Sequence, residues 1–114
     1  MSIVSNHFRV SKIQNRVLDK PYFEPSTNTS FEITENQSFE ITFLAQAYPS
    51  LIVYTWFHPS GRQLMNDQMN IFIEDNRLVL KNLQRSDRGV YRCVAMNSIG
   101  STEVNFTLQI LCSF

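Results

Sequence analysis

From residue 39 onward, hydrophobic and polar side chains alternate in short runs separated by turn residues. The run over 39–45 places Phe39, Ile41, Phe43 and Ala45 on one face, because successive side chains of a strand point to opposite sides. Further short runs predict strands over 52–57, 69–74, 78–80, 90–96 and 103–111. Strands at this roughly 8–12-residue spacing are typical of an all-β sandwich or barrel.

The segment ahead of this pattern divides into two parts. Residues 21–25 and 30–34 predict two halves of a broken edge strand, since Pro21 and Pro25 have no N–H to donate to a sheet interior. Residues 1–18 fit both helical and strand spacing, and we interpret residues 1–20 as a linker or the end of a preceding module. The predicted domain therefore covers 21–111, followed by a C-terminal tail over 112–114.

A long motif of fixed spacing lies in residues 78–100. It reads L-x-L-x-x-L-x-x-x-D-x-G-x-Y-x-C-x-A-x-N-x-x-G and resembles strands E and F and the F–G turn of intermediate-set immunoglobulin domains. Trp56 stands at the position of that family's core tryptophan, and residues 35–38 (E-N-Q-S) are similar to its E-G-Q-S. The likeness covers about residues 20–111. It implies a two-sheet antiparallel Greek-key immunoglobulin-like sandwich.

The resemblance assigns structural roles to the residues that carry it. Trp56 is expected to fill the core, and Tyr91 to bond through its hydroxyl to backbone near Asp87. Gly89 suits a close approach without a side chain, and Gly100 suits a positive φ in the turn before the last strand. We expect these residues to hold the fold and none to act as a site.

The family's inter-sheet disulfide is predicted to be absent. Counting from Trp56 places Ala45 opposite Cys93, where the family has its second cysteine. Cys112 lies about seven residues beyond the position opposite Cys93, or ~23 Å along the strand, outside the ~7 Å Cα limit for a disulfide. We therefore expect Cys93 to be a small buried hydrophobe and Cys112 to be a free terminal thiol.

Composition and charge narrow the function classes. The chain is 43% hydrophobic and 18% charged, as in ordinary soluble domains, and its formal net charge is zero. Residues 1–20 have four basic residues against one acidic residue, and the remainder has six against nine. No apolar run approaches the roughly 18–20 residues that span a bilayer. We expect neither nucleic-acid binding nor membrane insertion by this chain.

The sequence contains no recognisable catalytic or cofactor motif. His7 and His58 do not have zinc-ligand spacing with Cys93 and Cys112. A nucleophile needs a base within hydrogen-bond reach, which a core Cys93 and a turn His58 do not provide. No glycine-rich phosphate loop is present. We expect no enzyme activity, no metal and no cofactor.

The outward face of the predicted sheet formed by 52–57, 90–96 and 103–111 is the candidate protein-binding surface. Its candidate residues are Val53, Phe57, Val94, Met96, Thr107 and Gln109. The first four form a contiguous apolar patch if the strands pair as the resemblance implies, and such patches mark partner sites. The alternative is that they pack on one another or under the strand after Gly61.

Three sequons mark candidate N-glycosylation sites at Asn28, Asn36 and Asn105. The connection Ala47-Tyr48-Pro49 resembles the strand B–C connection of several receptor and neural adhesion ectodomains. This resemblance and the sequons favour a module of a cell-surface adhesion molecule or receptor ectodomain, which binds proteins or spaces neighbouring modules. The predicted location is extracellular. The alternative is a module of an intracellular titin-like muscle scaffold in the sarcomere, which the missing disulfide favours.

Overall fold

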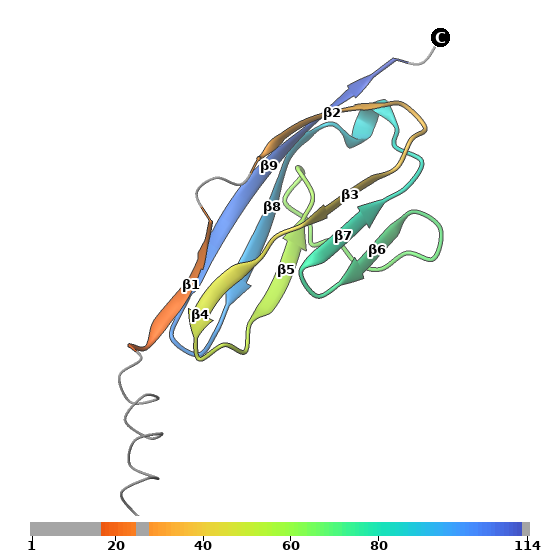
Figure 1. Cartoon of the computed structure of the whole chain (residues 1–114). Helices are drawn as coiled ribbons and strands as arrows, with labels where there is room; N and C mark the ends of the chain where they lie inside the picture. Colours follow the sequence, from red (N-terminus) through yellow and green to blue (C-terminus); the bar gives the residue numbers. More distant parts are fainter. Residues whose placement is uncertain (1–16, 25–27, 113–114) are drawn as a thin grey trace, which may run out of the picture.

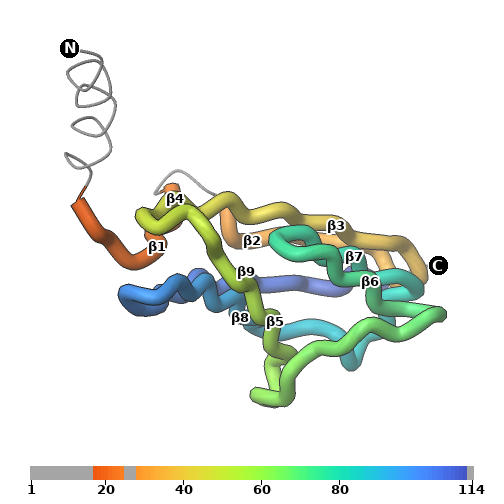
Figure 2. Tube along the Cα trace, turned by 90° about the horizontal axis from the view of Figure 1, so that it is seen from below, coloured from red at the N-terminus to blue at the C-terminus, as the bar shows by residue number. Residues whose placement is uncertain are grey.

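The computed structural model describes residues 17–24 and 28–112 and shows a two-layer β-sandwich (Figure 1). One layer has the strand order β2-β9-β8-β5, and the other has β3-β7-β6 beside a short β1-β4 pair. The strands are β1 Asp19–Phe23, β2 Ser30–Thr34, β3 Phe39–Thr42, β4 Ala45–Tyr48, β5 Val53–Phe57, β6 Ile71–Glu74, β7 Arg77–Leu80, β8 Gly89–Met96 and β9 Ser101–Leu111. Figure 2 shows the two layers from below. The predicted all-β immunoglobulin-like sandwich is confirmed.

The predicted broken edge strand is divided between the two layers. β1 pairs antiparallel with β4, whereas β2 pairs parallel with β9. β1 begins at Asp19, so Asp19 and Lys20 belong to the sandwich rather than to the expected linker. Residues 1–16, which make up most of that linker, and the end of the predicted tail, 113–114, lie outside the described residues.

The predicted strand over 39–45 is interrupted where its hydrogen-bonding partner changes. Phe39 to Thr42 pair with β7, and the Phe43 N–H still donates to the Asn76 carbonyl at 3.1 Å. Two residues later, Ala45 pairs with Phe23 of β1 instead. The alternation of buried and exposed side chains continues through the break, so the sequence pattern does not reveal it.

An aromatic cluster forms the centre of the core. Phe43 stacks on Trp56 with ring centroids 5.9 Å apart, and Phe106 lies 5.8 Å from Phe43 and 6.2 Å from Trp56. Tyr91 stacks on Phe106 at 5.1 Å. Each such pair contributes about 0.5–1.5 kcal/mol beyond the burial of its apolar area. The Trp56 indole N–H donates to the Asp75 carbonyl at 3.1 Å, so its one polar group is satisfied.

The structure corrects the position assigned to Ala45. Trp56 pairs directly with Cys93 across β5 and β8, and Phe43 stacks on Trp56. Ala45 lies one strand repeat further along, where its N–H donates to the Tyr54 hydroxyl at 3.2 Å. The residue at the level of Trp56 and Cys93 is therefore Phe43.

Both cysteines are free, as predicted. Cys93 is buried and lies opposite Val104 of β9, eight residues before Cys112. Its burial raises the pKa of the thiol to about 12. Cys112 is exposed beyond the end of β9.

The turn into β8 has the geometry that the motif implies. The Tyr91 hydroxyl donates to the Asp87 carbonyl, and an Asp87 carboxylate oxygen accepts the Gln84 N–H at 2.7 Å. Gly89 has φ +135°, and a Cβ there would lie 2.8 Å from Pro59 Cβ.

Gly100, in the turn before β9, does not have the positive φ that we expected, since among the glycines only Gly61 and Gly89 do. Its carbonyl instead accepts the Asn97 N–H at 2.9 Å.

Asn97 joins three segments at the end of the sandwich where β1 begins. Its side-chain amide donates to the carbonyls of Asp19 and Pro49 at 2.8 and 3.1 Å. Its side-chain oxygen accepts the N–H groups of Ile99 and Gly100. A buried asparagine that makes these four bonds fixes the β8–β9 turn against the first strand.

Candidate protein-binding surface

The outward face of β5 and β8 brings together three of the predicted residues. Val53 lies directly opposite Met96, and Thr55 lies opposite Val94. Val53 is 56% exposed and Met96 47% exposed, while Val94 is half-buried between them and Glu103 of β9. We call Val53, Val94 and Met96 the β5–β8 apolar patch. Val53 and Met96 are directly opposite, which sets their Cβ atoms about 4.5–5.5 Å apart. Val94 is two residues from Met96 on the same face of β8, about 7 Å away, so the three side chains adjoin.

Phe57 does not extend this patch as an open apolar side chain. It lies opposite Arg92, whose guanidinium carbon sits 4.2 Å from the centre of the Phe57 ring. Arg92 also forms an ion pair with Glu103 at 3.3 Å. The expected surface of four apolar residues is therefore three, bordered by a charged pair. The contact between Arg92 and Phe57 follows from the pairing of Trp56 with Cys93. In an antiparallel pair, that register sets the next residue, Phe57, opposite Arg92.

Thr107 and Gln109 lie on the same sheet but away from the patch. Thr107 pairs with Val90, and Gln109 pairs with Glu32 of β2. The nearest patch residue, Val94, is opposite Glu103, and four residues of strand separate Glu103 from Thr107, about 13 Å at about 3.3 Å per residue. The structure therefore does not join Thr107 and Gln109 to the β5–β8 apolar patch.

The three sequon asparagines are all exposed. Asn105 lies on β9 opposite Arg92, one strand away from the patch. The Asn28 side-chain oxygen accepts the Ser30 N–H at 3.2 Å. Asn36 adopts φ 73° in the turn after β2, and its side-chain oxygen lies 3.3 Å from the Gln84 amide. Asn105 is thus the sequon beside the candidate surface.

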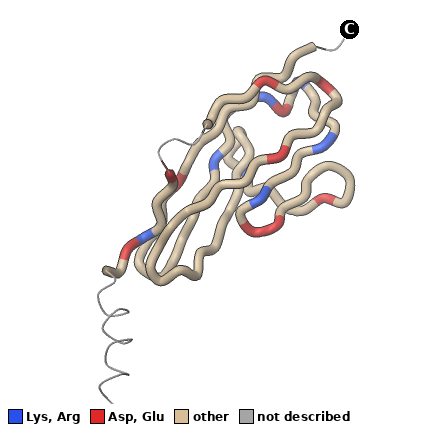
Figure 3. The backbone as a smooth tube through the Cα atoms, viewed as in Figure 1, with Lys and Arg blue, Asp and Glu red and all other residues tan. Residues whose placement is uncertain are grey.

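The described residues offer little to other kinds of chemistry. Within 17–24 and 28–112, no group of three His, Cys, Asp or Glu residues is placed to hold a metal ion. Burial lowers the pKa of His58, whose Nδ1 accepts the Ser60 N–H at 3.0 Å. Figure 3 shows basic and acidic residues interspersed along the described chain. No helix in this part of the protein is long and apolar enough to cross a membrane.

The profile of the immunoglobulin I-set domain matches residues 21–110. The chain belongs to the immunoglobulin I-set family. Human hemicentin-1 is 37% identical over 90 residues, which are 76% of this chain and 2% of that protein. The rat neural cell adhesion molecule L1 is 36% identical over 81 residues, 68% of this chain and 6% of that protein. The I-set chain thus spans only a few per cent of the length of these curated relatives.

Solved structures show the same fold for this I-set chain. The titin tandem A164–A165 superposes with a TM-score of 0.74 at 24% identity, covering 84% of this chain and 51% of that one. A Dscam isoform structure gives a TM-score of 0.73 at 18% identity, covering 82% and 25%. The titin and Dscam structures are therefore about equally similar to this domain in fold.

Proposed function

We propose that this I-set domain is a non-catalytic module of a cell-surface adhesion molecule or receptor ectodomain, located outside the cell. It binds another protein, or a copy of itself, through the β5–β8 apolar patch. Its likeness in sequence to L1 and the hemicentins supports this class of parent protein. The mechanism is surface complementarity: the apolar patch is buried in the contact while Arg92 and Glu103 lie at its rim.

The observation that carries the proposal is the direct pairing of Val53 with Met96 on an outward sheet face. Both side chains stay about half exposed although β5, the edge strand of this sheet, is paired with β8 along its length. Burying apolar surface yields about 25 cal/mol per Å², so such a patch stabilises a contact once a partner covers it. An acidic side chain at either position is expected to abolish binding.

A second candidate is a module of an intracellular titin-like scaffold. The observation that favours it is that both cysteines are free, because disulfides are rare inside cells and common outside them. The aromatic core, unlike a disulfide, forms without an oxidising compartment. In this case the domain bears tension between neighbouring modules.

Expression through a secretory pathway distinguishes the two candidates. The ectodomain proposal expects N-glycan on Asn105, Asn28 or Asn36, seen as a mass that a glycosidase removes. Single Asn→Gln variants identify the occupied site. A secreted, folded domain with no glycan on any of the three makes the intracellular scaffold the better assignment.

A further inference from the structure

A groove lies on the outer face of the other layer, away from the β5–β8 apolar patch. The loop over 66–70, which leads into β6, encloses a hollow of about 680 Å³ against β6 and β7. Phe72 and Val79 line its floor, Met69 lines its rim, and Arg77 and Lys81 contribute basic side chains. The lining also contains one acidic residue, Asp67, whose carboxylate accepts the Met69 N–H at 2.9 Å.

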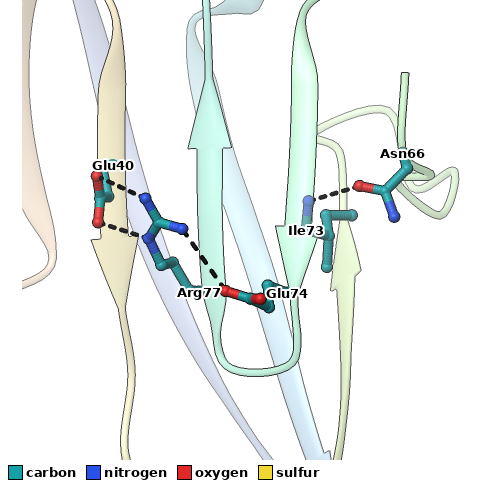
Figure 4. Close-up of polar contacts among 5 residues, drawn as sticks. All are labelled: Glu40, Asn66, Ile73, Glu74 and Arg77. Carbon is teal, nitrogen blue, oxygen red and sulfur yellow. Dashed lines mark hydrogen bonds and ion pairs between the residues drawn. The ribbon is translucent and has the colours of Figure 1, made fainter. Parts of the chain in front are cut away.

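The loop that forms the rim is held at both of its ends. The Asn66 side-chain oxygen accepts the Ile73 N–H at 2.6 Å (Figure 4). Asp67 and Ile71 exchange two backbone bonds of 2.8 and 3.2 Å, and the Asn70 carbonyl accepts the Lys81 N–H at 2.8 Å. The bonds from the Ile71 and Ile73 N–H groups occupy the edge of β6 that faces away from β7. A ligand strand therefore finds these N–H groups already occupied and cannot pair with β6 at this edge. A ligand in the groove must be recognised through its side chains.

Apolar side chains remain open in the groove. Met69 is 72% exposed and Phe72 46% exposed. Val79 is only 9% exposed although it alternates outward between the inward Leu78 and Leu80. An outward residue that is this well covered marks the deepest part of the floor. The groove thus offers a thioether, an aromatic ring and a recessed aliphatic side chain.

The two basic side chains of the groove differ in whether they already have an acidic partner. The Arg77 guanidinium binds Glu40 at 2.7 Å and Glu74 at 3.7 Å, on both sides (Figure 4). It also lies 5.6 Å from the centre of the Phe72 ring. Among the described residues, the Lys81 ammonium has no hydrogen bond or ion pair. The positive charge still available to a ligand is therefore at Lys81.

We propose that this groove binds an exposed segment of a partner protein in which an apolar side chain lies next to a carboxylate. The apolar side chain packs on Phe72 and Val79 beneath Met69, and the carboxylate pairs with Lys81. A neutral apolar segment leaves the ammonium unpaired, and a purely acidic one leaves the floor uncovered. The site is independent of the β5–β8 apolar patch, so the two proposals stand or fall separately.

The test is a titration of the ¹⁵N-labelled chain with an acetylated, amidated Leu-Glu-Phe tripeptide, followed by amide chemical shifts. Saturable shifts confined to residues 66–81 are expected, with millimolar affinity. The Leu-Gln-Phe peptide is expected to bind about two- to five-fold more weakly, as is the Glu peptide to Lys81→Gln, since an exposed ion pair is worth little. Lys20→Gln, an exposed lysine on β1, is the matched control and leaves affinity unchanged.

The apolar half of the site is tested with Met69→Gln, which lies on the exposed rim and leaves the fold intact. Weaker binding of both peptides to this variant is expected, because both use the apolar floor. Equal binding of the Glu and Gln peptides, with no effect of Lys81→Gln, overturns the carboxylate assignment. Shifts that map to β5 and β8 instead, or none at all, overturn the groove itself.

Discussion

Phe43 stacks on Trp56 with ring centroids 5.9 Å apart, directly beside the pairing of Trp56 with Cys93. The two sheets are thus joined at their centre by an aromatic contact. Phe106 and Tyr91 extend the contact into a cluster that spans both layers. The stability of the domain therefore does not depend on the redox state of its surroundings.

Thiol labelling tests this arrangement. At pH 8 the native monomer is expected to react at Cys112 alone, because burial raises the pKa of Cys93 to about 12 and keeps it protonated and inaccessible. In denaturant without reductant both thiols are expected to react, and reductant is expected to leave the melting temperature unchanged. Two fast thiols in the native state, or none in the unfolded state, contradict the structure.

Engineered cysteines locate the residue that lies across from Cys93. Phe43→Cys is expected to form an intramolecular disulfide with Cys93 under oxidising conditions, whereas Ala45→Cys is not. Intact mass before and after reduction, on verified monomer, distinguishes the two variants. A disulfide in the Ala45 variant alone restores the alignment expected from the sequence.

Gly89 is expected to resist substitution more strongly than Gly61. Gly89→Ala combines φ +135° with a Cβ that meets Pro59 at 2.8 Å, and should lower the free energy of unfolding by about 2–4 kcal/mol. Gly61→Ala has φ +96° but no atom within 4 Å, so only the backbone strain remains, about 1 kcal/mol. Urea unfolding measures both. Equal losses show that Pro59 does not constrain Gly89.

The pH dependence of stability is expected to report on Tyr91. Burial raises the pKa of its hydroxyl above the ordinary 10, so the folded state favours the protonated form. The resulting stability is present below pH 10 and is lost as the pH rises further, because the unfolded state then releases the proton more readily. Tyr91→Phe is expected to cost about 1 kcal/mol at pH 7 through the lost bond to Asp87.

The same variant provides the control at high pH. Cys93 also has a raised pKa, so some alkaline loss of stability remains in Tyr91→Phe. The loss should be smaller than in the parent chain. An identical alkaline decline in both proteins shows that the Tyr91 hydroxyl is not the group responsible.

Local sequence patterns predicted the strands and the residues that hold them. The spacing from Leu78 to Gly100 fixes Tyr91, Cys93 and Gly89 relative to one another, because a continuous strand and its entry turn set their geometry. Ala45 was misplaced because the count from Trp56 crosses the connection at 49–52. The periodicity of side chains along a strand does not predict the path of such a connection. The break between β3 and β4 was missed because the alternation of buried and exposed side chains continues through it while the pairing strand changes.

The surfaces were less predictable than the core. The outward phase of Val53, Val94 and Met96 follows from strand alternation alone. The cover of Phe57 by Arg92 depends on the register between two strands, and the groove depends on how the loop over 66–70 folds. Neither is encoded in the spacing of hydrophobic residues along one segment.

The most direct test of the proposed function is the adhesion of beads coated with the domain, measured to one another and to cells that display ectodomains. Wild-type beads are expected to bind, and Val53→Glu and Met96→Glu are expected to abolish binding without changing the melting temperature. Val90→Glu is the matched control: it is a 52% exposed valine on the same sheet face, about 20 Å from Met96 along β8. Binding that survives both patch variants, or is lost equally in Val90→Glu, contradicts recognition through the β5–β8 apolar patch.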